Sequence, residues 1–366
     1  MINIEFKGTC KSQIAFVYED SDAFPDIKEV FTGEFLGGFP QLCQNRLTVY
    51  IGLGKKEELT GRKLMDAVSK GVRELKKYNR YEAEADLSPV WESFGLQSVR
   101  SAVLGIKLGL YEYDAYHSDR KEETYRFVLK GVEKSAEAEQ CLKKASNLAD
   151  SVLYARELVN TPGNLLTPEL MAENMELKAK KLGVQAEILD AAQAQELGMG
   201  AFLAVASSSG NPPKLIVLRY LADPDSKERT ALVGKGVTLD TGGYCLKSPS
   251  TMFGIKGDMA GGAAVAGAVF ALAANKVKTN VVAVIPACEN RISDRSFAPG
   301  DVIRSMSEKM IEIRNTDCEG RLILSDAVTY AIREEGATRV LDIATLTGAV
   351  VGALGFSTAG VLTNSD

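Results

Sequence analysis

Two separate stretches of the chain concentrate residue types that can do chemistry. The first, residues 232–258, begins as the apolar run LVGKGV and then breaks into a glycine-rich loop. Lys235, Asp240, Lys247 and Asp258 lie where this change occurs. The apolar run is typical of a strand, so the sequence predicts that these charges are delivered at a strand end.

The second stretch, residues 315–322, reads NTDCEGRL and alternates Asp317, Glu319 and Arg321 with uncharged residues. An extended backbone would point these three side chains to the same side. If the two stretches meet, four carboxylates, two lysines and one arginine converge.

Four carboxylates cannot share a low-dielectric cleft unpaired, because like charges a few ångströms apart force protonation or demand a strong counter-charge. Carboxylate oxygens suit Mg²⁺ or Mn²⁺, and Zn²⁺ also accepts them. Two ions about 3.5–4 Å apart can share bridging acids. The residues therefore predict a two-metal site, and the alternative is that each of them is an ordinary loop cap or surface ion pair.

Four segments resemble, in order and spacing, the signature segments of the leucyl aminopeptidase family (cytosol aminopeptidase, peptidase family M17): VGKGVTLDTGG, YCLK, KGDMAGGAAV and NTDCEGRL. The resemblance extends from about residue 158 to the end, and the front of the chain is similar in layout. It implies five metal ligands: Lys235, Asp240, Asp258, Asp317 and Glu319. Asp240 and Glu319 would bridge two ions, and Lys235 would have to bind as the neutral amine.

The resemblance also implies roles for residues that do not bind metal. A metal-bound water would attack the scissile carbonyl, while Lys247 would stabilise the tetrahedral intermediate. Arg321 would hold a bicarbonate ion that serves as general base. Ile255, Thr345 and Gly348 would help line the pocket for a leucine-like first side chain. The free amino group of the peptide would bind one metal, which confines cleavage to the N-terminal residue.

Several other classes of site fit the sequence poorly. His117 is the single histidine, so a Ser-His-Asp triad, an HExxH site or a histidine-ligated zinc site is hard to build. Gly261, Gly262 and Gly267 lack the GxGxxG spacing of a dinucleotide loop, and VGKGVT is no P-loop because glycine follows its lysine. The proton transfers of a hydrolase would therefore depend on metal, carboxylate, lysine or a bound anion.

Composition gives expectations about partners and location. The net charge is −5 and basic residues are interspersed with acidic ones, so no nucleic-acid partner is expected. We expect no membrane span, because no uninterrupted apolar segment approaches the ~20 residues that a bilayer requires. The N-terminus lacks a signal pattern, which favours a cytoplasmic location.

The chain is organised as an α/β protein of two domains. Residues 1–134 alternate β-rich runs with helical patterns over residues 60–77 and 97–113 and predict an α/β accessory domain; the β-rich runs are INIEF, QIAFVYE, RLTVYIGL and YRFVLKG. Residues 135–160 predict a linking helix. Residues 161–366 predict a larger α/β catalytic domain with a mostly parallel central sheet, built from the runs VQAEIL, AFLAVAS, KLIVLRY, ALVGKGV, NVVAVIPA and RVLDIA. Ligands of such sheets bind beyond the carboxyl ends of strands, where the loops after ALVGKGV and IPACEN lie.

Relatives in the family continue further than Asp366, and the resemblance therefore implies a catalytic domain that is incomplete at its C-terminus. The family also implies a homohexamer for the full-length form. The main functional hypothesis is a binuclear aminopeptidase acting on peptides with Mn²⁺ or Zn²⁺. The alternatives are a non-catalytic scaffold or DNA-associated regulator of the same family, and an inactive fragment.

Overall fold

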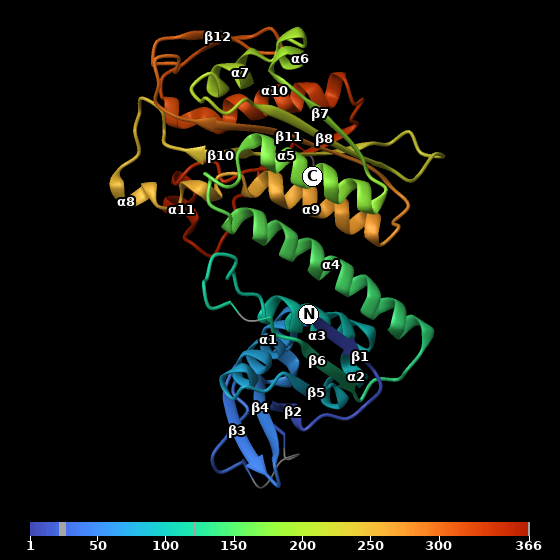
Figure 1. Cartoon of the computed structure of the whole chain (residues 1–366). Coiled ribbons are helices and arrows are strands. Elements are labelled where there is room, and N and C mark those ends of the chain that lie inside the picture. The colour runs from blue at the N-terminus through green and yellow to red at the C-terminus, as the bar shows by residue number, and fades with distance from the viewer. Residues whose placement is uncertain (22–26, 121, 365–366) are drawn as a thin grey trace. The chain divides into compact units, whose positions relative to one another are not determined.

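The computed structural model describes residues 1–21, 27–120 and 122–364. The chain divides into two compact units, Met1–Leu153 and Tyr154–Asp366, and both are α/β (Figure 1). The division falls within α4 (Ala136–Asn160), the helix that the sequence predicted over residues 135–160. The predicted two-domain α/β fold is thus confirmed.

The first unit has a central sheet in the order β1-β6-β5-β2-β4-β3, in which β3 alone of these strands pairs antiparallel. The strands are β1 (Ile2–Glu5), β2 (Ser12–Tyr18), β3 (Gly38–Cys43), β4 (Arg46–Gly54), β5 (Glu82–Asp86) and β6 (Tyr125–Lys130). The helical elements are η2 (Lys56–Glu58), α1 (Gly61–Lys77), α2 (Ser88–Phe94) and α3 (Leu96–Gly109).

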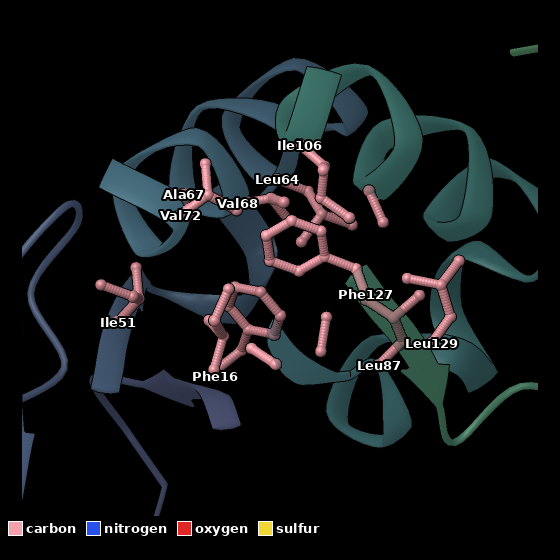
Figure 2. Packing of buried hydrophobic residues seen from close by; sticks show 14 of the residues in the cluster. Phe16, Ile51, Leu64, Ala67, Val68, Val72, Leu87, Ile106, Phe127 and Leu129 are labelled. Atoms are coloured by element: carbon pink, nitrogen blue, oxygen red, sulfur yellow. The ribbon is translucent and has the colours of Figure 1, made fainter. Parts of the chain in front are cut away.

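The core of this unit lies between the sheet and its helices. Leu64, Val68 and Val72 recur at helical spacing on α1 and are buried in one cluster with Phe16 and Phe127 of the sheet (Figure 2). The Thr60 hydroxyl accepts a hydrogen bond from the backbone N–H of Lys63 and caps the start of α1. Apolar spacing and a cap therefore explain why this helix forms here.

The second unit has a mixed sheet in the order β14-β9-β11-β8-β7, and β10 pairs with β11. The strands are β7 (Gln185–Leu189), β8 (Lys214–Leu221), β9 (Thr230–Gly234), β10 (Gly236–Asp240), β11 (Asn280–Asn290) and β14 (Arg339–Ile343). Strands β14, β9, β10 and β11 pair in parallel, whereas β8 runs antiparallel to both β11 and β7. The parallel part of the sheet carries the site.

Helices cover both faces of this sheet (Figure 1). On one face lie α5 (Pro168–Leu182) and α9 (Ala260–Ala274), and on the other α7 (Gly200–Ala206) and α10 (Glu319–Arg333). The shorter elements are α6 (Ala191–Glu196), α8 (Pro249–Met252), η3 (Ile255–Gly257), β12 (Val302–Arg304), β13 (Met310–Glu312), η4 (Thr316–Cys318) and α11 (Ala349–Leu354).

One expectation about this unit is wrong. The run AFLAVAS is not a strand but α7, and its buried residues Ala201, Phe202, Val205 and Ala206 follow helical spacing. The segment Ile255–Ala274 is long and apolar enough by composition to cross a membrane. In the structure α9 is a core helix, because ten of its fifteen residues are buried against the sheet and its neighbours.

Candidate metal centre

Lys235 lies between β9 and β10, two consecutive strands that each pair with β11, and directly follows the segment of β9 that pairs with β14. Its backbone N–H donates to the carbonyl of Ile343 on β14 at 3.1 Å. The side chain is 2% exposed and passes close to Gly320, where an added Cβ would lie 2.8 Å from the lysine Nζ. The absence of a side chain at Gly320 therefore leaves the space that the lysine occupies.

Four carboxylates gather around the two lysines at the ends of different elements. Asp240 ends β10, Asp258 follows η3, Asp317 lies in η4 and Glu319 begins α10. One oxygen from each of Asp240, Asp317 and Glu319 lies within 4.8 Å of the other two. Residues that are far apart in the sequence are thus brought to one place.

The contacts between these groups form two sets. Lys235 Nζ lies 2.7 Å from Asp258 Oδ2 and 2.7 Å from Glu319 Oε1. Lys247 Nζ lies 2.6 Å from Asp240 Oδ2 and also contacts Asp317 Oδ1. Each ammonium group therefore stands between two carboxylates, and four negative charges are faced by two positive ones.

Burial and the neighbouring charges shift the pKa values of the acids and lysines in this cluster. Burial raises the pKa of Asp258 to about 7, although Lys235 acts in the opposite direction. Burial likewise raises the pKa of Glu319. For Lys235 burial acts to lower the pKa, but Asp258 and Glu319 outweigh it and raise the pKa. The pKa of Lys247 is also raised, because its two carboxylate partners outweigh burial. A cation that binds Lys235 as an amine would have to displace its proton.

The donor set fits divalent cations. Asp258 Oδ2 and Glu319 Oε1 are buried, and among the described residues neither accepts a hydrogen bond of good geometry, despite the nearby Lys235 ammonium. Buried carboxylate oxygens of this kind are what Mn²⁺, Mg²⁺ and Zn²⁺ prefer as oxygen ligands. Positive charge greater than that of the two lysines is needed to hold all four carboxylates ionised.

A cavity of about 450 Å³ opens onto this cluster. It is lined by Lys235, Asp240, Lys247, Asp258, Asp317, Ala344, Thr345, Leu346, Thr347, Gly348, Val350 and Val351. The Thr345 hydroxyl donates to Asp258 Oδ1 at 2.8 Å, and the Thr345 carbonyl accepts from Lys235 Nζ at 3.1 Å. Of the three residues expected at the substrate pocket, Thr345 and Gly348 line the cavity, whereas Ile255 does not.

The expected extended backbone at residues 315–322 is wrong. The Asn315 side chain accepts a hydrogen bond from the Asp317 backbone N–H at 2.8 Å and starts the helical turn η4, which leads into α10. Residues two apart on a helix do not face the same way, so Glu319 does not share a face with Asp317 and Arg321 as the alternation predicted. Arg321 is exposed and is not among the residues that line the cavity with Asp317. An asparagine ahead of an acidic first turn is a helix-start signal that could have revealed this.

Sequence reasoning missed Asn290 and Thr316, which connect the ligand-bearing segments. Asn290 Nδ2 donates to Asp240 Oδ1 at 2.9 Å. The Thr316 hydroxyl donates to the Gly242 carbonyl at 2.6 Å and accepts from the Cys245 N–H at 2.8 Å. The available signal for Asn290 was its place at the carboxyl end of a predicted strand.

Comparison with protein families gives two matches. The catalytic domain of the cytosol aminopeptidase family matches residues 153–366, and the N-terminal domain of that family matches residues 40–120. A probable cytosol aminopeptidase from Clostridium perfringens is 43% identical over 325 residues, covering 87% of this chain and 66% of that protein. One from Treponema denticola is 40% identical over 370 residues, covering 100% of this chain and 78% of that protein.

Solved structures with the same fold are also similar. The bottromycin maturation enzyme BotP in complex with Mn has a TM-score of 0.81 at 28% identity, covering 97% of this chain and 74% of that one. A mutant of tomato leucine aminopeptidase has a TM-score of 0.86 at 28% identity, covering 97% and 75%. With both domains matched, this chain belongs to the cytosol aminopeptidase family of metalloexopeptidases, peptidase family M17.

Proposed function

We propose that this chain forms a two-metal centre that releases the N-terminal residue of peptides, with a preference for leucine-like side chains. The observation that carries the proposal is the convergence of Asp240, Asp258, Asp317 and Glu319 around two lysines, beside a cavity that the three aspartates line. Surface loop caps would be scattered and solvated, whereas these acids are gathered, with Asp240 and Glu319 buried and the other two half-buried.

The residues that would hold the ions follow from their grouping. Asp240, Asp317 and Glu319 have oxygens close enough to share one ion. Lys235 and Asp258 would hold a second ion together with Glu319, and Asp240 and Glu319 would be shared. When bound, Mn²⁺, Zn²⁺ or Mg²⁺ would supply Lewis acidity and activate a water molecule. The Mn-bound structure of the related BotP supports divalent metal as the cofactor.

Lys247 would stabilise the negative charge that develops on the scissile carbonyl oxygen. Its side chain lines the cavity, and Asp240 and Asp317 keep its pKa raised against burial, so it is an ammonium group at neutral pH. With those two carboxylates held by cations, the Lys247 side chain would be free of its pairing partners and would donate to a substrate oxygen. A preorganised donor of this kind contributes about 3–4 kcal/mol to transition-state stabilisation.

The cavity wall supports an apolar first residue in the substrate. Ala344, Leu346, Val350 and Val351 line it together with the charged residues and Thr345. Burying a leucine side chain against such a surface contributes about 1.5–3 kcal/mol. The substrate class we propose is therefore peptides with a free amino group and a leucine-like first residue.

Three further parts of the proposal depend on the family resemblance. Arg321 would hold bicarbonate as general base, although it is exposed and outside the cavity lining. Bicarbonate dependence of turnover, lost in Arg321→Ala, would test this role. The protein would act as a homohexamer in the cytoplasm, which light scattering and cell fractionation would examine.

The direct test compares two variants of the site after loading with Mn²⁺ or Zn²⁺ and dialysis. Wild type should retain close to two divalent ions per chain and release leucine from leucyl amide. Lys247→Ala should retain the metal and lose turnover, whereas Asp258→Ala should lose metal. Asp294→Ala, which removes an exposed carboxylate, is the matched control and should change neither.

The outcomes separate the hypotheses. Chelation followed by reloading should abolish and restore turnover in wild type. Metal binding without turnover would favour the non-catalytic alternative. A chain that binds no divalent ion would contradict the proposal, and equal metal loss in the Lys247 and Asp258 variants would contradict their separate roles.

A further inference from the structure

We propose that Asn290 is a positioning residue of the metal centre, which turns the Asp240 carboxylate so that a single oxygen faces the cations. The inference rests on the proposed function, because it concerns how this chain prepares a site for divalent ions. Asn290 is the last residue of β11 and is 0% exposed.

The position of Asn290 is set by strand pairing. In the parallel register of β10 with β11, Asp240 is the partner of Asn290. The Asn290 carbonyl accepts from both the backbone N–H and the hydroxyl of Thr241, each at 2.9 Å. The backbone on both strands is therefore fixed where the two side chains meet.

The amide of Asn290 donates a hydrogen bond to one of the two carboxylate oxygens of Asp240. Nδ2 donates to Asp240 Oδ1 at 2.9 Å, and the same oxygen accepts from the Gly242 backbone N–H at 2.9 Å. A carboxylate oxygen has about two acceptor sites, so Oδ1 is filled. Only Oδ2 is left to face the cavity, where Lys247 Nζ lies 2.6 Å away. The geometry points to Asp240 binding cations through Oδ2 alone.

The second N–H of the same amide holds another ligand segment. Asn290 Nδ2 also donates to the carbonyl of Thr316 at 3.0 Å, directly before Asp317. One side chain thus joins the end of β10 to η4, and through it to the start of α10. It sets the spacing between Asp240 and Asp317 as well as the orientation of Asp240.

The oxygen of the Asn290 amide indicates that the two N–H groups determine the orientation of the side chain. Asn290 Oδ1 is buried and accepts no hydrogen bond from the described residues, which costs about 1–3 kcal/mol. The flipped amide would place Oδ1 against Asp240 Oδ1 and the Thr316 carbonyl, two other acceptors. The observed orientation is the one in which both N–H groups donate, at the expense of the oxygen.

The end of β11 has its own anchor next to Asn290, which provides a control. The buried Glu289 carboxylate accepts from Ser209 Oγ at 2.5 Å, Asn211 Nδ2 at 3.1 Å and Arg291 Nε at 2.6 Å. These contacts do not involve Asp240. Asn211→Ala therefore removes an asparagine donor at the same strand end without touching the metal centre.

The test measures Mn²⁺ binding to the full chain by titration calorimetry at fixed pH, together with unfolding of the metal-free form. Asn290→Ala and the isosteric Asn290→Asp should weaken Mn²⁺ affinity about 10–100-fold, as expected when a partner of a metal ligand is removed. Asn211→Ala should lower stability while keeping wild-type affinity. Two Asn290 variants are used because Asp at this position places three acceptors together and can prevent folding.

The results distinguish this inference from the proposed function. If wild type binds two ions and folded Asn290→Ala binds them as tightly, the positioning role is wrong while the metal centre stands. The same conclusion follows if Asn290→Ala changes only the stability of the metal-free protein. If wild type binds no divalent cation, the proposed function fails and the positioning role fails with it.

Discussion

Replacing Gly320 by alanine should damage the metal centre through Lys235 without removing any charged group. A Cβ at Gly320 would lie 2.7 Å from Lys235 Cε, 2.8 Å from Nζ and 3.0 Å from Cδ. The end of a lysine side chain usually moves aside at little cost. Here it is 2% exposed and held by Asp258, Glu319 and the carbonyl of Thr345.

The size of the effect follows from these distances. To reach an ordinary contact of 3.4 Å, Cε and Nζ must retreat by about 0.6–0.7 Å, which displaces Nζ from its 2.7 Å contacts and weakens them. Overpacking of this kind costs about 1–3 kcal/mol. Alanine in place of glycine returns about 0.5–1 kcal/mol of helix stability. We therefore expect Gly320→Ala to lose about 1–2 kcal/mol of unfolding free energy and to bind Mn²⁺ less tightly.

Urea unfolding and calorimetric Mn²⁺ titration measure the two effects. Gly352→Ala in α11 is the matched control, because an added Cβ there meets no atom within 4 Å. It should be as stable as wild type or slightly more stable, with unchanged affinity. A Gly320→Ala protein that matches the control in both measurements would refute the argument that Lys235 is held rigidly.

Two other predictions concern Glu289, next to Asn290 in the second unit, and Gly71 in the first unit. Burial acts to raise the pKa of Glu289, but hydrogen bonds from Arg291 and Ser209 outweigh burial and lower the pKa. The ionised carboxylate therefore stabilises the fold at pH values above its unfolded pKa of about 4.3. This stabilisation is lost as the pH falls through the lower pKa of the folded state. Glu289→Gln should therefore be less stable than wild type at pH 7, with a gap that narrows below about pH 4; a gap independent of pH in urea unfolding would be the contrary result. Gly71→Ala would place a Cβ 2.7 Å from Ile14 Cγ2 and should cost about 1–3 kcal/mol in the first unit. Its Mn²⁺ affinity should equal that of wild type, and weaker binding would count against the independence of the two units.

The sequence predicted elements best where local pattern and tertiary context agree. The Val- and Ile-rich runs became β8, β9 and β11, and the apolar spacing of residues 60–77 became α1. The strand β5, EAEAD, was missed because glutamate and alanine favour helix. It lies between β2 and β6, where Ala83 and Ala85 are buried, so packing on both sides overrides local preference.

The same limit applies to the site. Motif spacing singled out the acids and lysines that the structure brings together. It could not show that a helical turn begins after Asn315, or that Arg321 is exposed and outside the cavity lining, because neither follows from the alternation of charged residues. Nor could it show that Asn290 meets Asp240, because that contact depends on the register of β10 on β11. Contacts set by cap geometry and strand register do not follow from a list of residue types.

The supports of the metal centre differ in stiffness from one side to the other. Lys235 lies between the paired strands β9 and β10 and Asp240 ends β10, whereas Asp258 directly follows one 3₁₀ turn and Asp317 lies in another. Short turns yield more readily than a paired sheet. An ion of larger radius would therefore be accommodated by outward movement of the turns, with the sheet acting as a fixed reference. Exchange between Mn²⁺ and Zn²⁺ should then alter one wall of the cavity and leave the other in place.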